Sequence, residues 1–258
     1  LRMSEFATAP AQAAAILVAR RLAGLPGERL PETCRPADLA AALAIQAQVS
    51  AQIGDSVGGW KCGMPADGRL VLAPIYTASI HRGSEVPLFA RKGMARIEPE
   101  LAFVLAHHLP LRSEPYSEAE IDAAIGSVHL ALELIQSRYL DPASLTFAEA
   151  LADGLVNQGL LLGPAVPLAV ARQCSELALQ IEIGSATIDK AGKHPATQPL
   201  APLYWLVEFL RQSGQGLTAG QAVITGSYAG VLELPLDQPL SIHFGQLGQI
   251  DVRFCART

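Results

Sequence analysis

The chain has 258 residues, a length that fits one large domain or one domain with a small appendage. Half of its residues are hydrophobic, so it can bury a sizeable core. Its 24 acidic and 19 basic residues give a net charge of −5, which excludes the basic excess typical of a nucleic-acid-binding protein. We therefore expect no nucleic-acid partner.

The four cysteines are dispersed, and no two form a C-x-x-C pair. This usage is typical of reduced thiols in a cytosolic protein rather than of a disulfide framework. Residues 13–19 are apolar, but Arg20 and Arg21 follow this short run instead of preceding it, unlike a secretory signal. No stretch approaches the roughly 18 apolar residues of a membrane span. We expect a cytoplasmic protein without a membrane partner.

In chain order, the first predicted elements are two helices, at residues 9–23 and 37–53, the second beginning after Pro36 and ending at Gly54. They form an N-terminal helical appendage over residues 1–55. Residues 56–258 form a β-rich domain, in which we expect the chemistry to lie.

From residue 57 onward the segments are shorter and richer in Val and Ile, with Gly and Pro between them. Strands are predicted at 57–63, 69–73, 95–106, 127–137, 159–162, 177–183, 222–226, 240–244 and 248–254. Helices are predicted at 117–125, 146–153 and 201–213, and Ser117 with Glu120 resembles a capping box. This pattern predicts an α+β fold with a mixed, mostly β core.

Two carboxylates stand two positions apart in the predicted strand 95–106. Side chains alternate between the faces of a strand, so Glu98 and Glu100 point the same way, about 7 Å apart. They repel each other, and a hard cation such as Mg²⁺, Mn²⁺ or Ca²⁺ removes that repulsion. Pro99 lacks a backbone N–H, which places this part of the strand at an edge or a bulge. The alternative is a solvated acidic face.

A third carboxylate, Glu133, lies in the otherwise apolar strand 127–137. A buried carboxylate is rarely left unpaired, so Glu133 needs a cation, a basic partner or a proton. Arg138, five residues further on, is the basic partner that the sequence offers. A shared cation and a pair with Arg138 both remain open.

Several blocks follow one another in a characteristic order between about Ala11 and the C-terminus. They are residues 59–63 (GWKCG), 98–103 (EPELAF), 131–138 (ALELIQSR), 152–163 (ADGLVNQGLLLG), 225–227 (TGS) and 248–254 (GQIDVRF). In order and spacing they resemble the hydratase/decarboxylase branch of the fumarylacetoacetate hydrolase superfamily, typified by 2-keto-4-pentenoate hydratase and 4-oxalocrotonate decarboxylase.

The resemblance implies an incomplete, strongly curved β-barrel with the N-terminal helices packed outside. It also implies Mg²⁺ or Mn²⁺ on Glu98, Glu100 and Glu133, substrates that are 2-keto acids or their dienol forms, and a homo-oligomer. Three carboxylates leave positions open on an octahedral ion, which a 2-keto acid can fill with its carboxylate and 2-oxygen. The cation then stabilises the developing enolate.

Four further residues are candidates for the chemistry. Lys61, in an apolar strand where desolvation would lower its pKa, is the candidate for proton transfer or for binding the substrate carboxylate; a snorkelling surface lysine is the alternative. Asp153 is a second catalytic candidate that orients a water or holds Lys61, or else a turn residue. Ser227 and Arg138 are the candidates for binding substrate, and Ser227 alternatively serves only its turn.

Two positions depart from the family pattern. Gln136 stands where an aspartate is typical, and Gly154 stands where an asparagine follows Asp153; Asn157, three positions on, is a possible compensation. We expect a metal-dependent lyase that hydrates a 2-hydroxypenta-2,4-dienoate-like substrate. The alternatives are a decarboxylase of 4-oxalocrotonate-type 2-keto diacids, an acylpyruvate hydrolase, for which the sequence shows no convincing His–Glu pair, and a metal-binding homologue without turnover.

Overall fold

The computed structural model describes residues 8–257. Its chain begins with α1 (Ala9–Ala23) and α2 (Leu39–Gln52), joined through a short 3-10 turn, η1 (Glu32–Cys34). Helix α1 ends where Gly24 adopts a left-handed conformation with φ of 65°. Helix α2 begins two residues later than predicted, because the side chain of Asp38 accepts a hydrogen bond from the Ala41 amide and caps the helix there.

The larger sheet carries the candidate residues. Its strand order is β2-β1-β10-β5-β6-β7-β3, and β11 pairs with a second stretch of β5. The strands are β1 (Val57–Cys62), β2 (Leu72–Tyr76), β3 (Ile80–His81), β5 (Met94–Leu105), β6 (Ile125–Ile135), β7 (Asn157–Val166), β10 (Ala222–Ile224) and β11 (Leu232–Pro235). The long antiparallel strands β5, β6 and β7 form its centre.

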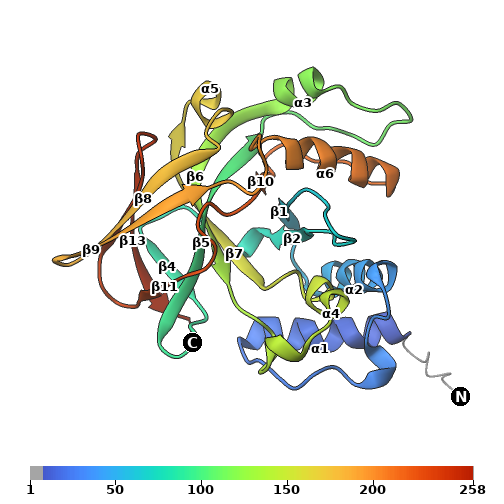
Figure 1. Ribbon diagram of the computed structural model, residues 1–258. Helices are drawn as coiled ribbons and strands as arrows, with labels where there is room; N and C mark the ends of the chain where they lie inside the picture. Colours follow the sequence, from blue (N-terminus) through green and yellow to red (C-terminus); the bar gives the residue numbers. More distant parts are fainter. Residues whose placement is uncertain (1–7, 258) are drawn as a thin grey trace, which may run out of the picture.

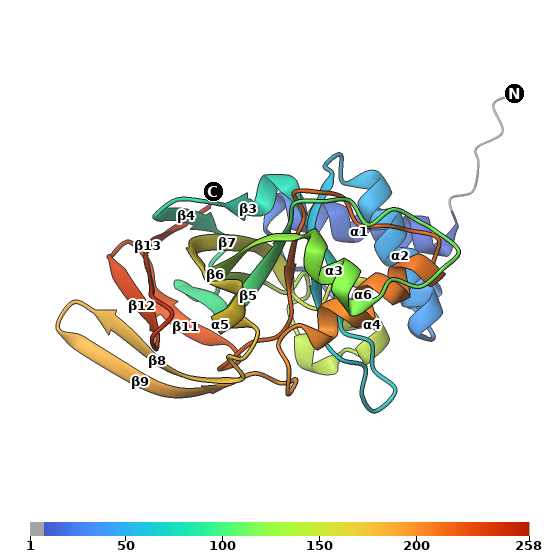
Figure 2. The same ribbon diagram turned by 90° about the horizontal axis from the view of Figure 1, so that it is seen from above.

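A second sheet of five strands has the order β4-β13-β12-β8-β9. Its strands are β4 (Glu85–Leu88), β8 (Glu176–Ile183), β9 (Ala186–Lys193), β12 (Leu240–Phe244) and β13 (Gln249–Ala256). Figure 2 shows it on the far side of the larger sheet from α1 and α2. Apolar side chains of the two sheets share one core, including Leu130, Leu132, Ile242 and Phe254. The sheets curl around this core as an incomplete barrel, which confirms the predicted α+β fold (Figure 1).

Four more helices complete the described part of the chain: α3 (Glu118–Ala124), α4 (Phe147–Ala152), α5 (Leu168–Ala171) and α6 (Ala201–Gln212). Short 3-10 turns, η2 (Thr77–Ser79) and η3 (Pro142–Ser144), lie between strands and helices. The predicted capping box of Ser117 and Glu120 is present at the start of α3. In α6, Leu203, Leu206 and Leu210 recur at helical spacing and are buried in the main core.

Helices α1, α2 and α4 pack together in a cluster of their own (Figure 1). Leu17 of α1, Ile45 of α2 and Leu151 of α4 are all buried in it. Arg29, in the α1–α2 connection, donates two hydrogen bonds of 2.7 Å to the carboxylate of Glu149 in α4. These contacts join the N-terminal helices to the segment between β6 and β7. The domain boundary between residues 55 and 56 stays a prediction.

The predicted strands differ from the observed ones in position and in number, since β3, β4, β9 and β11 were not predicted. The strand predicted at 69–73 is β2 (Leu72–Tyr76), displaced towards the five buried residues of that segment. Strand β9 (Ala186–Lys193) was not predicted, because seven of its eight residues are exposed and it carries no apolar periodicity. In the described residues, no helix is long and apolar enough to cross a membrane.

Candidate active site

Strand pairing brings the three glutamates together. In the antiparallel register of β5 and β6, Glu98 lies directly opposite Glu133, and Glu100 is two residues further along the same face of β5. Each of the three offers a carboxylate oxygen, and these oxygens lie within 4.8 Å of one another. Glu98 is half-buried, Glu100 is 3 % exposed and Glu133 is 0 % exposed. Such burial is incompatible with a solvated acidic face.

Pro99 lies where the outer edge of β5 is open. On this edge β11 pairs with residues 94–97 and β10 pairs with residues 102–104, so the stretch between them has no strand partner there. The carbonyl of Pro99 instead accepts a hydrogen bond of 2.9 Å from the Tyr228 amide. Because the N–H and C=O of a strand residue point to the same side, the missing N–H of Pro99 removes no ladder bond. The predicted local edge is confirmed.

The loop that crosses this opening also holds Glu100. The amide of Gly226 donates a hydrogen bond of 2.8 Å to Glu100 Oε2. Gly226 has φ of 143°, and a Cβ at this position would lie 2.5 Å from Cγ of Pro195. Glycine is therefore required here, both by the backbone conformation and by the close approach of the neighbouring loop.

Burial and mutual repulsion disfavour the ionised forms of these carboxylates. Burial, and then the charge of Glu133, raise the pKa of Glu98 to about 7. Burial, followed by the charges of Glu133 and Glu98, raises the pKa of Glu100 well above its usual 4.5. A divalent cation removes this repulsion, and carboxylate oxygens are the donors that Mg²⁺, Mn²⁺ and Ca²⁺ prefer. The three residues thus fit a hard cation by donor chemistry, by spacing and by charge.

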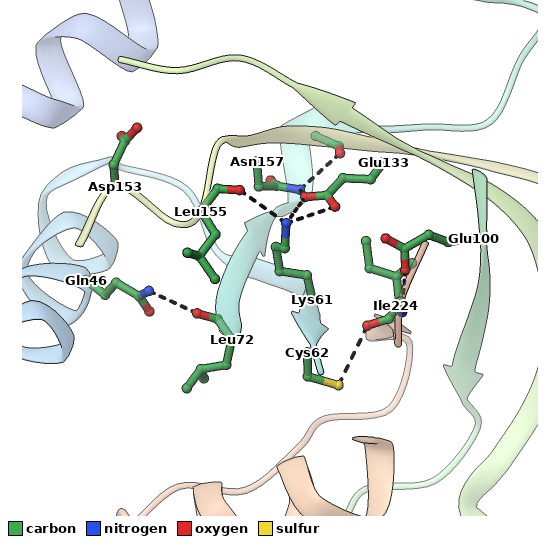
Figure 3. Close-up of polar contacts among 12 residues, drawn as sticks. Gln46, Lys61, Cys62, Leu72, Glu100, Glu133, Asp153, Leu155, Asn157 and Ile224 are labelled. Carbon is green, nitrogen blue, oxygen red and sulfur yellow. Dashed lines mark hydrogen bonds and ion pairs between the residues drawn. The ribbon is translucent and has the colours of Figure 1, made fainter. Parts of the chain in front are cut away.

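Lys61 of β1 is the basic partner of Glu133 (Figure 3). Its Nζ donates to Oε1 at 2.7 Å and Oε2 at 2.9 Å of Glu133, and to the carbonyl of Leu155 at 3.2 Å. Lys61 is 8 % exposed, so the snorkelling interpretation is wrong. Burial lowers the pKa of Lys61, but the Glu133 carboxylate outweighs it and the pKa lies above the usual value, opposite to the predicted direction.

Asn157, at the start of β7, is a contributor whose role the sequence did not define. Its Nδ2 donates a hydrogen bond of 2.9 Å to Oε1 of Glu133 and one of 3.2 Å to the carbonyl of Gly159. Together with Lys61 it fixes the orientation of the Glu133 carboxylate. Asn157 follows a turn and belongs to no periodic pattern in the sequence. Its contact with Glu133 is therefore visible only in the structure.

The structure places Arg138 and Asp153 together, away from the glutamates. Nε of Arg138 donates to Oδ1 of Asp153 at 2.6 Å, and its Nη1 donates to the Asn157 carbonyl at 2.8 Å. The predicted contacts of Arg138 with Glu133 and of Asp153 with Lys61 are replaced by this pair. In Figure 3, Asp153 lies on the far side of Leu155 from Lys61. Neither Arg138 nor Asp153 lines the cavity beside the glutamates.

The turn after α4 has an unusual backbone. Gly154, Leu155 and Val156 have φ values of 74°, 49° and 63°, all in the left-handed region. For a β-branched residue such as Val156 this conformation is strained. Glycine and asparagine adopt it most readily, so Gly154 suits this position although the family pattern has asparagine. Gln136, the second departure, donates from Nε2 to the Gly24 carbonyl at 3.0 Å and so binds the end of α1.

A cavity of about 430 Å³ opens beside the three glutamates. Lys61 and Ser227 line it, together with the loops at residues 62–71 and 195–196. The hydroxyl of Ser227 makes a long hydrogen bond of 3.4 Å to the Gly230 carbonyl. Of the predicted site residues, the fold therefore gathers Lys61, Ser227 and the three glutamates around one cavity.

No protein-family model matches the chain. It is 32 % identical over 184 residues to 2-oxo-hept-4-ene-1,7-dioate hydratase of Escherichia coli, an alignment that covers 67 % of this chain and 66 % of that protein. It is 24 % identical over 167 residues to 2-keto-4-pentenoate hydratase of Paraburkholderia xenovorans (strain LB400), covering 62 % of this chain and 58 % of that protein. The matches thus span less than two thirds of these relatives.

The fold matches the structure of 4-oxalocrotonate decarboxylase from Pseudomonas putida G7 in complex with magnesium and adipate. The TM-score is 0.78 at 17 % identity, over 95 % of this chain and 97 % of that one. At this identity the match speaks for the fold alone. The relatives by sequence and by fold are fumarylacetoacetate hydrolase superfamily members. The chain belongs to the fumarylacetoacetate hydrolase superfamily.

Proposed function

We propose that this protein is a metal-dependent lyase that hydrates the dienol form of a 2-keto acid, a substrate resembling 2-hydroxypenta-2,4-dienoate. The observation that carries the proposal is the convergence of three buried carboxylates within 4.8 Å beside a cavity of about 430 Å³. The two hydratase relatives support the choice of hydration.

Glu98, Glu100 and Glu133 would hold the cation. When bound, Mg²⁺ or Mn²⁺ supplies the Lewis acidity that stabilises negative charge on the 2-oxygen of the substrate. The amide of Gly226 keeps Glu100 turned towards this point, and Asn157 does the same for Glu133.

Hydration of the dienol requires two proton movements and one water. A proton is added at C5 and the 2-hydroxyl loses its own, giving an α,β-unsaturated 2-keto acid; water then adds at C4 while C3 takes a proton. Lys61 has an ammonium group at the cavity wall, held by Glu133 and the Leu155 carbonyl, and we assign it the proton transfer. Ser227 also lines the cavity, where its hydroxyl can donate to the substrate carboxylate.

Asp153 and Arg138 act in this proposal as positioning residues. Their ion pair fixes the turn that carries Leu155 and Asn157, the neighbours of Lys61 and Glu133. This assignment replaces the direct catalytic and substrate-binding roles expected from the sequence. On the resemblance we also propose a homo-oligomer, which light scattering during size-exclusion chromatography would test. The four cysteines, all free, support a cytoplasmic location.

A decarboxylase of vinylogous 2-keto diacids is the second candidate. The same carboxylate cluster and Lys61 suit the enolate that forms when CO₂ leaves. The fold shared with the decarboxylase at a TM-score of 0.78 is the observation in its favour. Release of CO₂ from a diacid substrate distinguishes it from hydration.

The test measures the ultraviolet absorbance of a 2-hydroxy-2,4-dienoate with Mg²⁺ or Mn²⁺ and with a chelator. We expect the absorbance to fall only with the metal, and Glu98→Gln to lose metal-dependent turnover by roughly 100-fold or more while retaining its circular-dichroism spectrum. Glu176→Gln, an exposed pair partner of Lys193, is the control that keeps activity. Full activity of Glu98→Gln would reject the ligand assignment, and metal binding without turnover would indicate a non-catalytic homologue.

A further inference from the structure

The outer wall of the cavity is apolar. Besides the glutamates, Lys61 and the loop of residues 225–230, its lining consists of Cys62, Gly63 and five further residues: Met64, Ala66, Val71, Pro195 and Ala196. A substrate held at its keto-acid end by a cation on the three glutamates would extend along these side chains. Their chemistry therefore decides what the far end of the substrate can be, provided that the proposed function holds.

The charges at the inner end of the cavity are already balanced. The three carboxylates, the ammonium of Lys61 and a divalent cation together carry no net charge. Lys61 is the only basic residue among the described residues that line the cavity, and its Nζ is bound by both oxygens of Glu133. One substrate carboxylate can bind at the cation. A second carboxylate, at the far end, would find no free positive group.

Two other basic residues belong to the lining loops or adjoin them. Arg69, in the loop that carries Met64 and Val71, lies over the ring of Phe147 at 5.4 Å from its centroid. His194 precedes Pro195 and is 3 % exposed, with its ring hydrogen-bonded to Ala196 and Thr225. Burial lowers the pKa of His194, so this ring is neutral near pH 7. His194 therefore supplies no counter-charge for an anionic far end, and the Arg69 guanidinium lies over Phe147 rather than among the lining residues.

We infer that the site selects 2-keto monoacids whose far end is uncharged and apolar, and discriminates against 2-keto diacids. A carboxylate placed against the less exposed part of this wall, at Val71 and Ala196, loses water without gaining a partner. Such a group typically weakens binding by at least about tenfold. An uncharged methyl or vinyl end has no such desolvation cost, and it gains apolar contact with Met64 and Val71.

The test compares two unreactive ligands of equal carbon number, 2-oxohexanoate and 2-oxohexanedioate, by calorimetry on the Mg²⁺-loaded protein at constant free Mg²⁺. We expect the monoacid to bind at least about tenfold more tightly. Val71→Arg adds a cation to the wall and should reverse or abolish the preference. Val170→Arg, at an exposed position of α5, is the matched control and should leave the preference unchanged. Met64→Arg, at a more exposed position of the same wall, repeats the test if Val71→Arg fails to fold.

The outcomes separate this inference from the proposed function. Equal or tighter binding of the diacid to the native protein overturns the inference and leaves the lyase proposal standing. Binding of neither ligand overturns both. An apolar wall can also promote loss of a carboxylate by desolvating it, so turnover is measured as well. A higher kcat/KM for CO₂ release from a vinylogous diacid than for hydration of a monoacid dienol likewise overturns the inference.

Discussion

Replacing Asp153 by asparagine tests whether a buried ion pair holds the turn that supports the candidate metal site. The side chains of Arg138 and Asp153 are 1 % and 3 % exposed, and they are joined by a hydrogen bond of 2.6 Å. Asp153→Asn keeps the shape and one acceptor oxygen but removes the charge. The guanidinium then remains buried without a counter-charge, which is the costly state for an ion pair.

The expected loss of unfolding free energy depends on which hydrogen bonds of Arg138 remain in the variant. Removing one partner of a buried pair costs roughly 3–5 kcal/mol. In Asp153→Asn, the carbonyls of Asp153 and Asn157 still accept from Arg138, as they do in the native protein at 2.6 and 2.8 Å. These retained bonds place the expected loss of unfolding free energy near the lower limit, about 3 kcal/mol. Asp189→Asn, at an exposed position in β9, should cost less than about 0.5 kcal/mol.

Urea denaturation followed by circular dichroism measures this loss, and a double-mutant cycle with Arg138→Met isolates the pair. The double variant removes both charges of this pair, so its loss should fall short of the sum of the single losses by 1 kcal/mol or more. Calorimetric Mg²⁺ affinity is the second measurement. It should fall by roughly tenfold in Asp153→Asn, because the turn also positions Asn157 against Glu133. Additive losses, or native Mg²⁺ affinity in a destabilised variant, would refute the reasoning.

Two further predictions concern single side chains. Lys61→Met should reduce turnover by roughly 100-fold or more while Mg²⁺ affinity is retained or increased, because a positive charge next to the cation site is removed; turnover within tenfold of the native value would exclude Lys61 from proton transfer. In Glu149, burial raises the pKa, but hydrogen bonds from Arg29 and Thr146 outweigh it and the pKa is lowered. The pair therefore stabilises the fold fully above the unfolded pKa of about 4.5, and this contribution is lost as the pH falls through the lower folded pKa. Glu149→Gln should lose about 1–3 kcal/mol at pH 7 by urea denaturation, and the difference from the native protein should shrink below pH 4.5.

The convergence of the three glutamates was largely predictable from sequence because its signals are local. Strand alternation places Glu98 and Glu100 on one face, and the apolar neighbours of Glu133 indicate a buried carboxylate. The long periodic segments also predicted β5, β6 and the helices α1, α2 and α6. Each of these inferences needs only neighbouring residues and a known repeat.

The residues that hold the three glutamates in place were not predictable, because they act through contacts between segments that are distant in sequence. Gly226 reaches Glu100 across 126 positions of sequence, and Lys61 reaches Glu133 across 72. The partner of Arg138 depended on the path of the strained turn at residues 154–156, which no propensity indicates. The predicted direction of the Lys61 pKa was wrong for a related reason: the sequence shows the apolar strand that desolvates Lys61 but not the carboxylate of Glu133 that the fold places beside it.

The apolar cavity wall bears on the choice between hydration and decarboxylation. A vinylogous 2-keto diacid loses its far carboxylate, the group that would lie against Met64 and Val71. There, desolvation would weaken binding of the diacid and at the same time raise the energy of the carboxylate towards its loss. Decarboxylation at this site would thus combine a high KM with a sizeable kcat, whereas a monoacid dienol meets no such penalty and should show a low KM. We therefore favour the hydratase, because the charge of the candidate metal site, Lys61 bound to Glu133 at its edge and the apolar wall all suit one substrate, a monoacid dienol.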